Sequence, residues 1–132
     1  MWDSVLGTAL VPLHYPTGQG AQTAVEFAIN PAHFHDTFAA DLPAEQAAVM
    51  AVTQRPEASL AFSEPSGVPA WKTLPAWAVV ATGDKAAGSD VIRAMASRAG
   101  ATITEVEGSH VIMISQPQVG TRVILSAVAA VS

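Results

Sequence analysis

The chain contains no cysteine among its 132 residues. Disulfide bonds, cysteine-based zinc sites and a thiol nucleophile are therefore excluded. Positive charge is also scarce, because six Lys and Arg residues, scattered along the chain, stand against eleven Asp and Glu residues. Nucleic-acid binding requires a clustered basic face, and binding to anionic lipid requires a polybasic stretch. We therefore expect neither a nucleic acid nor a membrane surface as a partner.

Long hydrophobic runs are missing as well. The longest apolar tract, residues 123–131, is interrupted by Ser126, whereas a membrane-spanning helix needs roughly 20 apolar residues. The first four residues carry no basic charge, which a secretory signal would require. These features favour a soluble protein of the cytoplasm.

The composition itself is that of a folded domain. Half of the residues are hydrophobic, with Ala and Val frequent, and only 13% are charged. A disordered chain has the opposite balance, and 132 residues are enough for one domain with a core. We divide this single domain into an irregular lead-in (residues 1–22), a helical segment (residues 23–63) and a C-terminal part (residues 64–132).

Local patterns identify elements in the first half of the chain. Residues 1–22 show neither a helical nor a strand period, whereas Asn30-Pro31 joins a capping side chain to a proline at the first helical turn. The resulting predictions are an extended segment at 23–29, short helices from 31 and at 44–54, and one more helical turn at 57–63. No strand is expected between residues 31 and 63.

The second half alternates strand and helix patterns. The apolar run 76–81 predicts a strand buried on both faces, as in parallel sheets. Ser89 is a suitable N-cap for a helix that ends before Gly100. A second strand is predicted at 102–106 and a last helix from Pro117. Together they form a βαβα unit with a right-handed parallel crossover, and the fold class is α/β.

Two ionisable residues follow the two predicted strands. Asp84 comes after the first strand and His110 after the second. The carboxyl ends of parallel strands share one edge of the sheet, so the two side chains can meet. A carboxylate that accepts the imidazole proton orients and stabilises a catalytic histidine. The alternative is that Asp84 is a turn residue and His110 a structural loop residue.

Several stretches in the same order resemble one family. Three of them surround the two ionisable residues: the stretch that ends at Asp84 (69–84), the helix after it (93–101) and the loop of His110 (107–117). The other two, 34–43 and 54–56, resemble pieces of a helical cap. These stretches resemble the α/β-hydrolase superfamily, in particular small bacterial esterase-like members related to salicylate-esterase and hydroxynitrile-lyase-type proteins. The resemblance spans residues 30–131 and implies a partial α/β-hydrolase fold, in which a helical cap precedes the C-terminal βαβα unit.

The resemblance also implies a reaction. It assigns the catalytic acid to Asp84 and the base to His110, in a Ser-His-Asp mechanism that hydrolyses a small apolar ester or carbonyl compound without a cofactor. Phe34, Phe38, Met50 and Trp71 could line an apolar pocket for such a substrate. They could equally be core residues of the cap.

One part of the family pattern is absent from the sequence. The nucleophile lies in a Gly-x-Ser-x-Gly elbow, and neither this frame nor a His-Gly-type oxyanion loop occurs in the chain. Because the family order is Ser, acid, His, we expect the missing segment upstream of residue 1. The lone chain is then inactive and needs the upstream half of the hydrolase. The alternative is a non-catalytic remnant or a small-molecule binding module.

Four further expectations concern single residues and the surface of the sheet. His33 and His35 form a His-x-His pair without an obvious third ligand, so we expect no metal site. Ser109 is expected to make loop hydrogen bonds, and Asp41 is interpreted as a turn or capping acid. A sheet cut in half exposes an edge and apolar faces, so we expect a homo-oligomer or poor solubility.

Overall fold

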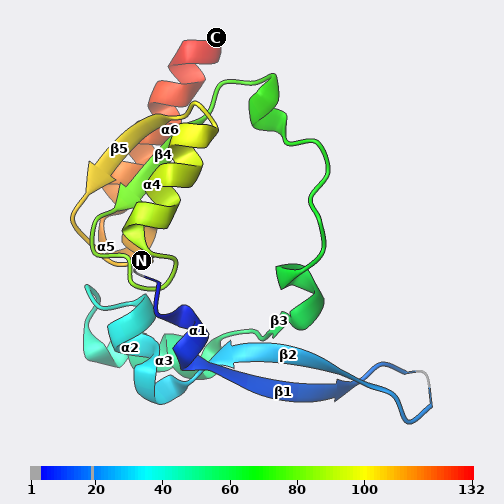
Figure 1. Cartoon of the computed structure of the whole chain (residues 1–132). Coiled ribbons are helices and arrows are strands. Elements are labelled where there is room, and N and C mark those ends of the chain that lie inside the picture. The colour runs from blue at the N-terminus through cyan, green and yellow to red at the C-terminus, as the bar shows by residue number, and fades with distance from the viewer. Residues whose placement is uncertain (1–3, 19) are drawn as a thin grey trace.

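The computed structural model describes residues 4–18 and 20–132, in two units joined by a long connection (Figure 1). The first unit, here called the cap unit, spans residues 6–58. Its elements are α1 (Leu6–Ala9), β1 (Leu10–Pro16), β2 (Thr23–Ile29), α2 (Pro31–Phe38), α3 (Ala44–Thr53) and β3 (Glu57–Ala58). The three strands form an antiparallel sheet in the order β1-β2-β3.

The start of the chain is more regular than expected. Among the residues of the lead-in that the structure describes, 4–18 and 20–22, Leu6–Ala9 is helical and Leu10–Pro16 pairs with β2 from Leu10↔Ile29 to Pro16↔Thr23. The prediction of an irregular lead-in is therefore wrong, and for residues 1–3 and 19 it lies outside the described residues. The strand escapes the sequence patterns because most of its side chains are exposed. Its two prolines are tolerated because β1 is an edge strand.

The helical core of the cap unit agrees with the sequence. The Asn30 side chain accepts a hydrogen bond from the backbone N–H of Ala32 at 3.0 Å, and Pro31 begins α2. α2 and α3 pack together and contribute to the main hydrophobic cluster: Ala9, Ile29, Phe34, Ala39, Leu42, Ala47, Ala51 and Val111. The last of these residues belongs to the segment that carries His110, so the two units share a core.

The absence of a strand between residues 31 and 63 is a wrong prediction. Glu57–Ala58 pairs antiparallel with β2, and the expected helical turn begins only afterwards, as the 3-10 helix η1 (Ser59–Phe62). A two-residue strand is too short to produce a periodic signal. The open edge of β2 explains why this segment is extended.

The second unit is the expected βαβα unit, with α5 added before the last helix. It contains β4 (Trp77–Ala81), α4 (Ser89–Arg98), β5 (Thr102–Val106), α5 (Ile112–Ser115) and α6 (Pro117–Val131). β4 and β5 are parallel, from Trp77↔Thr102 to Ala81↔Val106. Figure 1 shows α4 on one face of this pair and α6 on the other.

Two details of the βαβα unit differ from the sequence predictions. Ser89 is the first helical residue of α4 rather than its N-cap, and Gly88 takes the cap position at a φ of 88°. Only Val80 and Ala81 of β4 are buried, while its first three residues are half-buried. The strand is not covered on all sides, because β5 is the one strand that pairs with it among residues 4–18 and 20–132.

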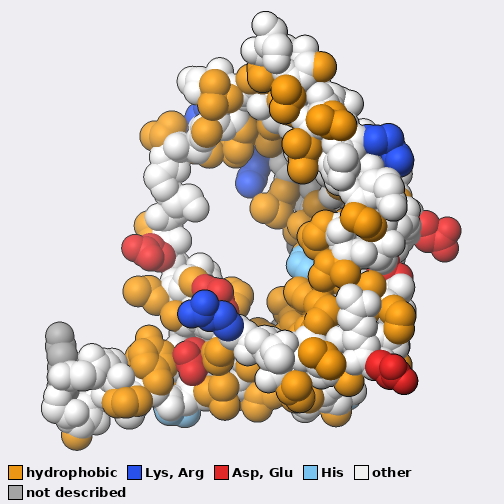
Figure 2. Space-filling model, turned by 180° about the vertical axis from the view of Figure 1, so that it is seen from behind, with side chains coloured by type: hydrophobic (Ala, Val, Ile, Leu, Met, Phe, Trp, Pro, Cys, Tyr) orange, Lys and Arg blue, Asp and Glu red, His pale blue; other side chains and the backbone are white. Residues whose placement is uncertain are grey.

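The connection from β3 to β4 runs away from both units. It contains η1 and the 3-10 helix η2 (Ala70–Lys72) and exposes the apolar side chains of Leu60, Phe62, Val68 and Leu74. Figure 2 shows an opening between this connection and the rest of the molecule, with hydrophobic side chains along much of its rim. A large apolar surface of this kind usually marks an interaction site.

Gln54 joins the end of β2 to α3. Its side-chain oxygen accepts the N–H of Ile29 at 2.8 Å, and its amide nitrogen donates to the carbonyls of Ile29 and Ala51 at 2.8 and 2.7 Å. The Gln54→Ala variant leaves these backbone groups without their partner. We expect the free energy of unfolding to fall by about 1–3 kcal/mol.

Urea unfolding measures this loss. Gln46→Ala is the matched control, because Gln46 lies exposed on α3 and its side chain makes no hydrogen bond within the described residues. Equal unfolding midpoints for the two variants would contradict the role assigned to Gln54.

Candidate active site

Hydrogen bonding between the parallel strands continues beyond their ends. The N–H of Thr82 donates to the carbonyl of Val106 at 2.8 Å, and the N–H of Gly83 donates to the carbonyl of Gly108 at 3.0 Å. A Cβ atom on Gly83 would lie 2.8 Å from the Gly108 oxygen, closer than real Cβ contacts. Glycine at this position therefore allows the acid loop (residues 82–88) to lie directly against the histidine loop (residues 107–111).

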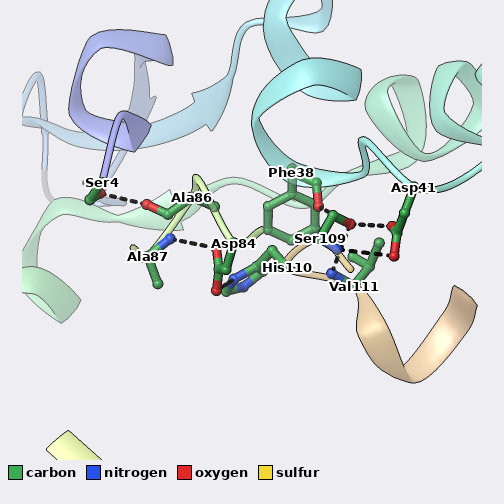
Figure 3. Close-up of polar contacts among 9 residues, drawn as sticks. All are labelled: Ser4, Phe38, Asp41, Asp84, Ala86, Ala87, Ser109, His110 and Val111. Atoms are coloured by element: carbon green, nitrogen blue, oxygen red, sulfur yellow. Dashed lines mark hydrogen bonds and ion pairs between the residues drawn. The ribbon is translucent and has the colours of Figure 1, made fainter. Parts of the chain in front are cut away.

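The two loops bring the predicted acid and histidine together. Oδ2 of Asp84 lies 2.9 Å from Nδ1 of His110, and Oδ1 accepts the backbone N–H of Ala87 at 3.0 Å (Figure 3). An ionised carboxylate only accepts hydrogen bonds, so the shared proton is on Nδ1. Nε2 of the neutral ring is then free to accept a proton, as a general base requires.

The burial of the pair suits this chemistry. Asp84 is 7% exposed, whereas the His110 side chain is 34% exposed. The Asp84 carboxylate is thus buried from solvent and held by its hydrogen bonds to Ala87 and His110. The edge of the imidazole ring remains accessible to a reactant. Among residues 4–18 and 20–132, no serine hydroxyl forms a hydrogen bond with His110.

The cap unit contacts the histidine directly. The ring of Phe38, at the end of α2, lies 4.7 Å from the His110 ring between centroids and 5.1 Å from the ring of Phe34. On the other side, the N–H of Val5 donates to the carbonyl of Lys85 at 2.9 Å. The pair therefore lies where the two units meet (Figure 3).

Asp41 is part of this junction, which the sequence analysis did not anticipate. It accepts hydrogen bonds from the backbone N–H of Ser109 at 3.0 Å, from the Ser109 hydroxyl, and from the Ser115 hydroxyl at 2.6 Å. The prediction of loop hydrogen bonds for Ser109 is confirmed. Of the two interpretations offered for Asp41, the turn position is correct, because Asp41 lies in the turn between α2 and α3. The capping role is wrong, because α3 follows Pro43 without a side-chain cap.

Of the cavities that adjoin the site, two are lined by residues that the sequence predicted for it. One of about 460 Å³ lies in the cap unit and is lined by Phe34, Phe38 and Met50 together with Leu6, Leu10, Phe27, Ile29 and Phe62. The other, of about 390 Å³, is lined by Asp84, His110, β4 residues 77, 79 and 81, and residues of α4 and α6. Three of the four expected pocket residues thus share a cavity. Trp71 lies on η2 and lines neither of the two.

The histidine pair in α2 has another environment. Nε2 of His35 lies within hydrogen-bonding distance, 3.0 Å, of the Leu42 carbonyl and joins α2 to the turn before α3. No group of three or more His, Asp or Glu residues is arranged to hold a metal ion within the described ranges.

In the same ranges, no helix combines the length and hydrophobicity needed to cross a membrane.

Comparison with known proteins places this geometry in a family. Residues 2–121 match the model of the Alpha/beta hydrolase family, and the chain belongs to that family. Its fold is similar to the crystal structure of polyneuridine aldehyde esterase, with a TM-score of 0.73 at 15% sequence identity. The similarity covers 89% of this chain and 48% of the esterase, so the chain spans about half of that protein's length. None of the curated proteins matches the chain.

The hydrogen bonds to Asp41 make the junction sensitive to acid. Burial raises the pKa of the Asp41 carboxyl, but the hydrogen bonds from Ser109 and Ser115 outweigh it, and the pKa lies below its ordinary value of 3.8. The folded state therefore favours the ionised carboxylate. The stability gained is fully present above the ordinary pKa and is lost as the pH falls through the lowered one.

Urea unfolding at a series of pH values tests this dependence. We expect the wild-type chain to exceed Asp41→Asn in free energy of unfolding by a constant amount at neutral pH. The difference should shrink below about pH 4. A difference that stays the same throughout the acid range would show that ionised Asp41 contributes nothing.

Proposed function

We propose that this chain carries the general base and the acid of a hydrolase for small esters or related carbonyl compounds. The observation that supports it is the hydrogen bond between the buried Asp84 carboxylate and Nδ1 of the half-exposed His110. In hydrolases of this type such a pair orients the imidazole and stabilises its protonated form. Membership of the Alpha/beta hydrolase family supports the same reaction class.

The nucleophile in this proposal is a serine that these 132 residues do not contain. No Gly-x-Ser-x-Gly frame is present in the sequence. The cavity along β4 supports a location for the missing segment, because it lies between α4 and α6 and has Asp84 and His110 among its lining residues. A strand added there, parallel to β4, would end beside the histidine.

The reaction then follows from the proton positions. The serine oxygen adds to the carbonyl carbon of the ester while its proton passes to Nε2 of His110. Asp84 stabilises the imidazolium, which returns the proton to the departing alcohol and leaves an acyl-serine. Water attacks this second ester with the same proton transfers, and the products are a carboxylic acid and the free serine.

The cap unit supports an apolar substrate. Its cavity of about 460 Å³ is lined mainly by apolar side chains, among them Phe34, Phe38 and Met50. Phe38 also contacts the His110 ring. An acyl or aryl group held in this cavity would be separated from the base only by the ring of Phe38. The structurally similar protein, polyneuridine aldehyde esterase, is named as an esterase, which agrees with an ester substrate.

Complementation tests the proposed mechanism. DNA next to the Met1 codon that encodes a Gly-x-Ser-x-Gly segment would be co-expressed with this chain, and turnover of p-nitrophenyl acetate measured. We expect activity for the pair and none for the lone chain. His110→Ala should lower turnover about 10⁶-fold and Asp84→Asn about 10⁴-fold.

Asp36→Asn is the matched control, because Asp36 is exposed on α2 and makes no hydrogen bond or ion pair within the described residues. Its activity should equal that of the unmodified pair. Activity that survives His110→Ala would overturn the assignment of the base. Turnover by the lone chain that depends on His110 would overturn the need for a second segment.

A second candidate is a small-molecule binding module. It is favoured by the cavity of the cap unit, which does not require a nucleophile. If no neighbouring DNA encodes the elbow and the lone chain binds an aromatic ester without cleaving it, binding is the function. Met50→Lys should abolish that binding, because it replaces an apolar side chain of the lining by a long charged one.

The exposed edge of β4 leads us to propose that the lone chain self-associates. Unpaired strand edges and apolar surfaces join other chains unless they are covered. We expect light scattering to show species larger than a monomer. Val79→Lys, which places a charge in the cavity along β4, should reduce them. The control Val52→Lys, on exposed α3, should not, and a monomeric wild-type chain with a sharp melting transition would contradict the proposal.

A further inference from the structure

We propose that Asp41 is a positioning residue for His110, connecting the cap unit to the loop that carries the histidine. The proposal rests on His110 being the base proposed above. Asp41 lies in the turn between α2 and α3, far from His110 in sequence. Its three hydrogen bonds come from residues on either side of the histidine: two from Ser109, one position before it, and one from Ser115.

The direction of these bonds distinguishes Asp41 from an ordinary turn acid. A turn or capping carboxylate bonds the amides of its own turn or helix. The side-chain oxygens of Asp41 accept hydrogen bonds from Ser109 in the histidine loop (Figure 3) and from Ser115 in α5. The carboxylate oxygens of Asp41 therefore hydrogen-bond mainly to the segment that carries the proposed base.

The backbone next to Ser109 is adapted to this contact. A Cβ atom on Gly108 would lie 2.8 Å from Oδ2 of Asp41 and would collide with Cδ1 of Ile112. A larger residue here would force the Asp41 carboxylate or the Ile112 side chain to move away from the loop. Gly108 is also the residue whose carbonyl accepts the N–H of Gly83. One short stretch of backbone is thus held from the acid loop and from the cap unit.

The consequence for His110 is that three groups restrain it. Asp84 holds Nδ1, Phe38 packs against the ring, and Asp41 fixes the backbone just before it. The first restraint sets the tautomer and the second limits ring rotation. The third determines where the ring lies relative to the cap cavity. Loss of Asp41 should therefore displace Nε2 without removing the Asp84 bond.

Nuclear magnetic resonance of the full chain tests this directly. The ring signals of His110, assigned with His110→Gln, and amide exchange of Ser109 would be recorded for Asp41→Asn and for the control Asp36→Asn. We expect Asp41→Asn to shift or broaden the His110 ring signals and to speed Ser109 exchange by about tenfold or more. Asp36→Asn should change neither.

Single hydroxyl variants keep the test decisive if Asp41→Asn unfolds. Ser115→Ala removes one donor and should shift the His110 signals in the same direction, whereas Ser115→Thr keeps the hydroxyl and should restore them. Unchanged His110 signals and Ser109 exchange in folded Asp41→Asn would overturn the proposal, as would equal effects of Ser115→Ala and Ser115→Thr.

This readout separates the proposal from the proposed function, because it requires no catalysis. In the complemented enzyme, Asp41→Asn should lower kcat and leave KM near its original value. Altered His110 signals together with an inactive complemented pair would refute the hydrolase function alone. An active pair with unaltered His110 signals in Asp41→Asn would refute the positioning role alone.

Discussion

Hydrogen bonding between β4 and β5 continues past the last paired strand residues, through Thr82 and Val106 and then through Gly83 and Gly108. Loops that leave parallel strands usually diverge, and here two further bonds keep them in contact. The geometry of the Asp84–His110 pair depends on this contact, because each residue follows its glycine by one or two positions. A bulkier residue at Gly83 would separate the loops and lengthen the distance between carboxylate and imidazole.

The cap unit restrains the part of the histidine loop that lies beyond the reach of the strands. A loop held only at its base can still tilt, and the histidine loop extends beyond the sheet. Val111 enters the hydrophobic cluster of the cap unit, while Ser109 is held by Asp41. An apolar contact and a charge-assisted hydrogen bond act on neighbouring residues, and the second is the more directional. The cap unit is therefore both a wall of the cavity and a support for the loop that carries His110.

The sequence predicts well what repeats locally or follows a known frame. The parallel strands, the helix start at Asn30-Pro31 and the meeting of Asp84 with His110 all follow from periodicity, capping chemistry and topology. β1 could not be predicted, because its side chains are mostly exposed and its stability comes from backbone pairing with β2. The contact of Asp41 with Ser109 joins residues 68 positions apart, and no local pattern encodes it.

The position of Trp71 illustrates the same limit. A tryptophan near a cap is a reasonable pocket residue, yet η2 lies on the connection that borders the opening seen in Figure 2. Several large apolar side chains on that connection are exposed. β4 and β5 form a two-stranded sheet, smaller than the parallel sheets that normally bury such strands on both sides. The exposed connection and the half-buried start of β4 thus share one physical feature, which is that no other element among residues 4–18 and 20–132 covers them fully.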